Sequence, residues 1–61
     1  MPILRVAMHP GRTLEQKRAY VSELTRVTIE VFQCPPENVE VLLQEVPRDL
    51  WAKSGVLKSE S

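Results

Sequence analysis

The sequence is poor in the features that stabilise very small proteins. It contains one cysteine, Cys34, so no disulfide can form within the chain. With one cysteine and one histidine it also offers no ligand set for a structural zinc ion. A chain of 61 residues gains little stability from its own core. Because 43% of the residues are nevertheless hydrophobic, we expect a single domain, residues 1–61, whose remaining apolar surface is covered by other subunits.

Charge and hydrophobic runs exclude several classes of partner. Eight basic residues balance eight acidic residues, so the net charge is zero. Nucleic acids and anionic membranes attract strongly basic surfaces, and we therefore expect neither as a partner. No apolar stretch approaches the roughly 20 residues of a membrane span, and the N-terminus lacks the pattern of a secretion signal. The expectation is a cytoplasmic protein, which an unpaired cysteine favours.

Patterns in the first half of the chain predict a strand followed by a long helix. Residues 2–8 are almost entirely apolar and run into a Pro-Gly turn at 10–11. Thr13 and Gln16 have the spacing of a capping box, which marks the start of a helix. Apolar residues then recur at intervals of three and four, which predicts an amphipathic helix over 14–33.

The second half of the chain predicts one more long strand. Two prolines at 35–36 prevent the helix from continuing, and residues 39–46 have a strand-like composition that ends at Pro47. A strand, a helix and a strand form a βαβ unit with parallel strands and a right-handed crossover. The expected fold class is therefore α+β, a βαβ subunit with a short C-terminal hairpin in 48–61. Within that segment, residues 56–57 are candidates to pair with a neighbouring subunit.

The second residue carries a chemical possibility of its own. A residue as small as Pro2 is the type after which the initiator Met1 is normally removed, and removal would expose a secondary amine. An α-amino group has a pKa of about 8 in water, and burial in an apolar pocket or a nearby cation lowers it. The neutral amine is then available as a general base. Many proteins begin with Met-Pro for other reasons, so this residue alone does not establish catalysis.

Five short segments between residue 2 and about residue 57 occur in a recognisable order. They are Pro2-Ile3, Gly11-Arg12-Thr13, Glu15-Gln16-Lys17, Pro36-Glu37-Asn38-Val39, and Trp51 near Gly55. Together they resemble the 4-oxalocrotonate tautomerase family, without gaps. The resemblance implies dimers assembled into hexamers, with active sites between subunits. It also implies an isomerase that interconverts the enol and keto forms of a small 2-hydroxy-dienoate or 2-oxo acid, with a role in aromatic degradation.

The resemblance implies roles for three residues. Pro2 would be the catalytic base that moves a proton between oxygen and carbon. Arg12 would hold a substrate carboxylate, for which the guanidinium fork is well shaped. Trp51 stands where the family has a pocket aromatic that keeps the amine desolvated, although it could equally fill a subunit interface. No metal ion or organic cofactor is implied. The expected partners are a small carboxylate substrate and further copies in a homo-hexamer, or a second chain in a hetero-hexamer.

One position departs from the family pattern and leaves alternatives open. Glu40 stands where the family has a second arginine. With Arg12 as the only assigned cationic anchor, the sequence predicts a preference for substrates with one carboxylate, unless another arginine such as Arg5 or Arg48 supplies the second charge or Glu40 points away from the site. Related haloacrylate dehalogenases activate water with a glutamate where this chain has Lys53, and carry an arginine where it has His9. His9 is interpreted as a surface turn residue. The alternatives are a hydratase or dehalogenase of a haloacrylate-type acid, and a non-catalytic subunit of a mixed oligomer.

Overall fold

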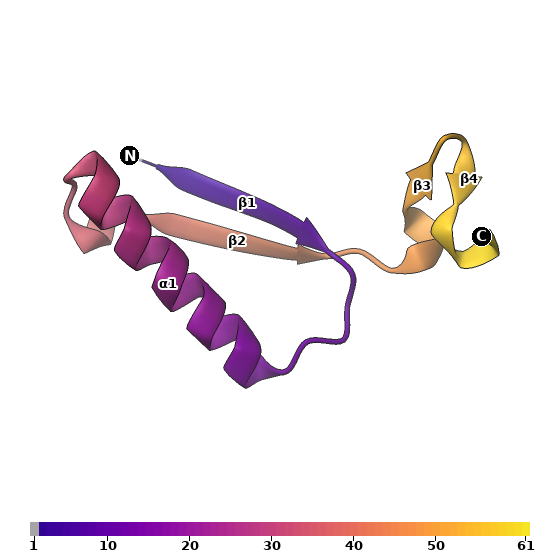
Figure 1. Ribbon diagram of the computed structural model, residues 1–61, viewed down its shortest axis with the longest axis horizontal. Coiled ribbons are helices and arrows are strands. Elements are labelled where there is room, and N and C mark those ends of the chain that lie inside the picture. Colours follow the sequence, from indigo (N-terminus) through magenta and orange to yellow (C-terminus); the bar gives the residue numbers. More distant parts are fainter. Residues whose placement is uncertain (1) are drawn as a thin grey trace.

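The computed structural model describes residues 2–61 and contains the predicted strand, helix and strand in that order (Figure 1). Strand β1 spans Ile3–Met8, helix α1 spans Leu14–Phe32 and strand β2 spans Glu40–Glu45. The two strands pair in parallel, and α1 crosses one face of the sheet that they form. The predicted βαβ fold is confirmed. The expected removal of Met1 falls outside the described residues.

The ends of α1 follow from local chemistry. The Thr13 hydroxyl accepts a hydrogen bond from the Gln16 N–H at 3.1 Å, and the Gln16 side-chain oxygen accepts one from the Thr13 N–H at 3.0 Å. This reciprocal pair satisfies two backbone donors that the first turn leaves free. At the other end, Gln33 adopts the left-handed conformation with φ of 55°, and its N–H donates to the Ile29 carbonyl. The predicted capping box and helix start are therefore confirmed.

The C-terminal segment forms a small hairpin next to a helical turn. A 3-10 turn spans Arg48–Leu50, and strands β3 (Ala52–Lys53) and β4 (Val56–Leu57) pair in antiparallel fashion. Ser54 and Gly55 connect them with φ of 55° and 81°, the conformation of a type I′ turn, whose twist matches that of the strands. The predicted hairpin is confirmed. Its strand β4 pairs with β3 of the same chain, and pairing of residues 56–57 with a neighbouring subunit stays a prediction.

The two faces of the β1–β2 sheet have different surroundings. Leu4, Val6 and Met8 are half-buried on the side of α1, whereas the alternate residues of β1 are exposed on the opposite side. Glu40 lies directly opposite Ile3 in the parallel register. Its side chain therefore belongs to the outward face of the sheet, which no other element of the chain covers (Figure 1).

One chain does not build a hydrophobic core. Across residues 2–61 no hydrophobic side chain is buried, and the one buried residue is Thr28, whose hydroxyl donates to the Leu24 carbonyl at 2.7 Å. Large hydrophobic residues are exposed on β1, α1, β2, the 3-10 turn at Arg48–Leu50 and β4: Ile3, Leu14, Tyr20, Val27, Val31, Phe32, Leu42, Leu50 and Val56. The radius of gyration is 14.6 Å, whereas a compact chain of this length would have about 10.5 Å.

The shape of the chain explains this large radius. The hairpin of β3 and β4 stands beyond the end of the β1–β2 sheet, separate from α1 (Figure 1). The described residues include no helix with both the length and the apolar character needed to cross a membrane.

Candidate active site

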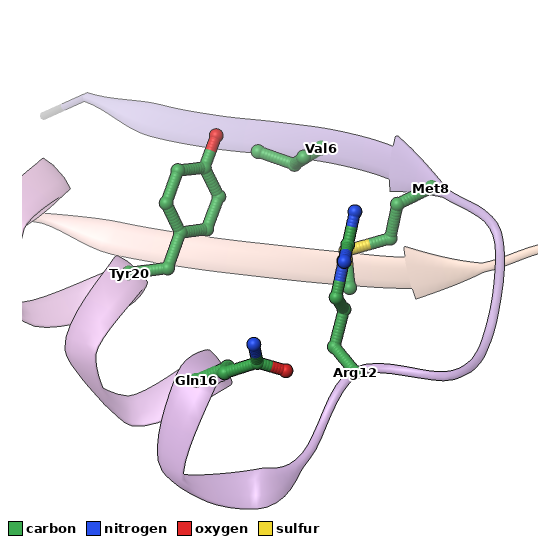
Figure 2. Close-up of a pocket in the computed structure, with 5 residues that line it drawn as sticks. All are labelled: Val6, Met8, Arg12, Gln16 and Tyr20. Atoms are coloured by element: carbon green, nitrogen blue, oxygen red, sulfur yellow. The ribbon is translucent and has the colours of Figure 1, made fainter.

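A hollow of about 320 Å³ opens between β1 and the start of α1. It is lined by Val6, Met8, Arg12, Gln16 and Tyr20. Figure 2 shows the Arg12 side chain extending from the loop towards the strands, with Met8 beside it and Gln16 and Tyr20 projecting from α1. One cation next to apolar and amide groups suits a small organic acid with an unsaturated body.

The loop before α1 determines where Arg12 lies. Gly11 has φ of 127°, which side-chain-bearing residues rarely adopt, although nothing lies within 4 Å of the position that a Cβ would take. Glycine is therefore required here for backbone conformation and not for space. Thr13 caps α1 immediately afterwards and fixes the exit of the loop. Arg12 is exposed and forms no ion pair within residues 2–61, so its guanidinium is available to an anion.

A second hollow, of about 380 Å³, shares two of its walls with the first. It is lined by Met8, His9, Pro10, Gly11, Arg12 and Arg48. Met8 and Arg12 line both hollows, so Arg12 lies between a partly apolar space and a basic one. Arg48 was not among the predicted core site residues, but it was, with Arg5, an alternative source of a second positive charge.

Trp51 lies at this same end of the sheet. Its ring packs on His9 with centroids 4.2 Å apart and a tilt of 44°, and the Lys58 ammonium lies 5.5 Å from the Trp51 ring centroid. His9 Nδ1 is 3.2 Å from the Val46 carbonyl oxygen, to which it donates when it carries the proton. The interpretation of His9 as a simple surface turn residue is corrected here, because the adjoining ends of β1 and β2 leave it half-buried and stacked.

Pro2 lies at the opposite end of the sheet from Arg12. The Pro2 carbonyl accepts a hydrogen bond from the Glu40 N–H at 3.1 Å, at the first residues of the two strands. The six residues of β1 then separate Pro2 from the loop, a distance of about 20 Å along the strand. One chain therefore brings Trp51 close to the Arg12 loop but does not bring Pro2 close to either.

Two further observations concern charged residues away from the two hollows and possible metal ligands. On the exposed surface of α1, Arg26 hydrogen-bonds and attracts Glu23, which holds the pKa of that carboxyl below its usual value. This pair lines neither of the two hollows at Arg12. Residues 2–61 contain no group of three or more His, Cys, Asp or Glu side chains arranged to hold a metal ion.

Known proteins resemble this chain over nearly its whole length. The family model described as tautomerase enzyme matches residues 2–61. The chain belongs to the tautomerase family. A 2-hydroxymuconate tautomerase of Comamonas testosteroni is 37% identical over 60 residues, which are 98% of this chain and 95% of that protein. A probable tautomerase of Ralstonia nicotianae is 41% identical over 59 residues, covering 97% of this chain and 84% of the relative.

Solved structures show which group of tautomerases this chain resembles. The crystal structure of a 4-oxalocrotonate tautomerase homologue matches with a TM-score of 0.91 and 43% identity, over 100% of this chain and 97% of the other. A heterohexamer 4-oxalocrotonate tautomerase from Chloroflexus aurantiacus matches with a TM-score of 0.87 and 33% identity, over 98% and 97%. The predicted membership of the 4-oxalocrotonate tautomerase family is confirmed, and the protein is an isomerase of that type. These names favour the tautomerase hypothesis over a hydratase or dehalogenase.

Proposed function

We propose that this tautomerase interconverts the enol and keto forms of a small 2-hydroxy-dienoate or 2-oxo acid, with the amine of Pro2 as the base. Family membership supports the reaction class. The observation that carries the substrate class is Arg12, a guanidinium without an acidic partner in residues 2–61 that lines a hollow with an apolar side. A carboxylate would bind the guanidinium, and the unsaturated chain would lie against Val6 and Met8.

The chemistry needs one base that first accepts and then donates a proton. With Met1 removed, the neutral Pro2 amine takes the proton of the enol hydroxyl, and the oxygen electron pair forms the carbonyl as the carbon–carbon double bond shifts. The resulting ammonium returns the proton to carbon and restores the amine. Arg12 holds the carboxylate during both transfers. Trp51 excludes water from the amine, and this favours its neutral form.

The same proposal requires several chains, because Pro2 and Arg12 lie at opposite ends of one β1 strand. We place Pro2 of one copy against the Arg12 and Trp51 end of another, in a homo-hexamer or a hetero-hexamer. The absence of a buried hydrophobic side chain in residues 2–61 supports association, as does the exposed outward face of the sheet. A heterohexamer among its structural relatives supports the same conclusion. A cytoplasmic location and a role in aromatic degradation stay predictions.

Chemical synthesis of residues 2–61 offers a direct test of the base. One preparation carries a free Pro2 amine and the other an acetylated one, and both are assayed with phenylenolpyruvate by the loss of enol absorbance. Because an amide nitrogen has no basic lone pair, acetylation should lower kcat by roughly a hundredfold or more. Sedimentation of both preparations controls for assembly. Equal turnover by the two preparations would remove Pro2 from the mechanism.

A further inference from the structure

The hollow between Arg12 and Arg48 has the character of an anion site. Arg12 and Arg48 both line the same 380 Å³ space, and the residues that line it include no acidic side chain. Neither arginine forms an ion pair within the described part of the chain. Two like charges that face one small volume repel each other, and a bound anion removes that cost. The arrangement is therefore more favourable when a negatively charged ligand is present.

Several contacts hold Arg48 beside the Arg12 loop. The Val46 N–H donates to the Met8 carbonyl at 2.7 Å, which continues the parallel pairing past the last residue of each strand. His9 Nδ1 contacts the Val46 carbonyl on the same side. The 3-10 turn that begins at Arg48 follows, and Trp51, whose N–H donates to the Arg48 carbonyl, stacks on His9. The position of Arg48 is thus set by backbone pairing and by ring packing together.

We propose that Arg48 is a second cationic anchor, and that the hollow it shares with Arg12 binds the second carboxylate of a small dicarboxylate substrate. Glu40 does not oppose such binding within the chain, because it lies on the outward face at the other end of the sheet. The preference for substrates with one carboxylate was predicted on the assumption that Arg12 is the only anchor. With Arg48 as a second anchor, a dicarboxylate is expected to bind instead. The identity of the bound acid as a substrate rests on the proposed function, whereas the anion site itself does not.

Two unreactive acids of six carbons test the anion site without any turnover. Adipate carries two carboxylates and hexanoate carries one, and their affinities for the assembled protein are measured by NMR titration at pH 7. Arg48→Gln should weaken adipate binding by roughly fivefold, the effect of losing one exposed charge pair, and should change hexanoate binding much less. Arg18→Gln is the matched control, since Arg18 is an exposed arginine of α1 that lines neither hollow at Arg12.

Arg48→Lys keeps the charge and provides a second variant, which should retain most of the adipate affinity. Equal losses for adipate and hexanoate in Arg48→Gln would overturn the proposal, because Arg48 would then not engage a second carboxylate. An equal loss of adipate affinity in Arg18→Gln would also overturn the proposal, because the effect would then come from the overall charge of the protein. Circular dichroism and sedimentation of each variant separate a binding change from a change in fold or assembly.

Activity provides an independent second measurement. Arg48→Gln should lower kcat/KM for 2-hydroxymuconate by roughly fivefold relative to phenylenolpyruvate, because only the former carries a second carboxylate. A constant ratio would contradict the proposed role of Arg48 in substrate choice. If neither compound is turned over by the native protein, the proposed function fails, and the adipate comparison still decides whether Arg48 is an anion anchor.

Discussion

The two ends of the β1–β2 sheet carry different chemistry. At the end where both strands begin, the Pro2 carbonyl accepts a hydrogen bond from the Glu40 N–H, so the candidate base lies beside the first residue of β2. Where the strands end, Arg12 and Arg48 line one hollow and Trp51 packs nearby on His9. A proton-transfer reaction on an organic acid needs both a base and an anion site. The chain contains both, separated by the length of a strand, so that a complete site must join different copies.

Mixing subunits of two inactive variants should give the largest change in activity. Pro2→Ala and Arg12→Ala oligomers should each lose most activity, the latter because an unpaired substrate carboxylate costs roughly 2 to 5 kcal/mol in kcat/KM. Refolding the two variants together should restore about a quarter of the sites, since independent chains then supply each residue. Each variant refolded alone is the control. No recovery in oligomers shown by native mass spectrometry to be mixed would mean that both residues act from the same chain.

An added charge on the outward face of the sheet should prevent assembly. The Pro2 end of one copy would then no longer meet the Arg12 end of another. Leu42 is 46% exposed on this face and is a candidate to be buried between subunits. Leu42→Lys would place a second cation there, directly opposite Arg5 in the parallel register, and burying two like charges between subunits would cost several kcal/mol. Sedimentation should then show loss of the oligomer, accompanied by loss of activity. Ser22→Lys, on the exposed surface of α1, is the control, and an intact Leu42→Lys oligomer would show that association uses other surfaces.

The smallest expected effect concerns the charge beside Pro2. A carboxylate close to an amine favours the ammonium form of that amine, and Glu40 is the residue whose backbone is hydrogen-bonded to Pro2. Glu40→Gln removes this attraction, and the acid limb of the kcat/KM profile should move to lower pH by roughly 0.3 to 0.5 units. Glu23→Gln, on the exposed surface of α1, should leave the limb in place. A shift to higher pH, or equal shifts in both variants, would contradict this account.

Local signals account for what the sequence could predict. Thr13 and Gln16 specify the helix start through a capping box, and the prolines at 35–36 prevent its continuation, so the βαβ order could be inferred without tertiary information. The outcome for the candidate site is different. Arg48 lies 36 positions after Arg12, and their common hollow depends on the parallel register of β1 and β2, which no local pattern encodes.

The same limit applies to two other residues of the site. The contact between His9 and Trp51 joins segments far apart in the sequence and also depends on the parallel register. The relation of Pro2 to Arg12 depends on association between chains, which the pattern of one chain indicates only through its excess of apolar residues.

The absence of a buried hydrophobic side chain in residues 2–61 makes protein concentration a determinant of folding. A chain that gains its core only from neighbouring copies has a free energy of unfolding that includes the free energy of association. Each tenfold dilution then removes about 1.4 kcal/mol for every association step. Dilution acts on such a protein as a denaturant does. Newly made copies would therefore complete their fold and their active sites only above a threshold concentration, at which both would appear together.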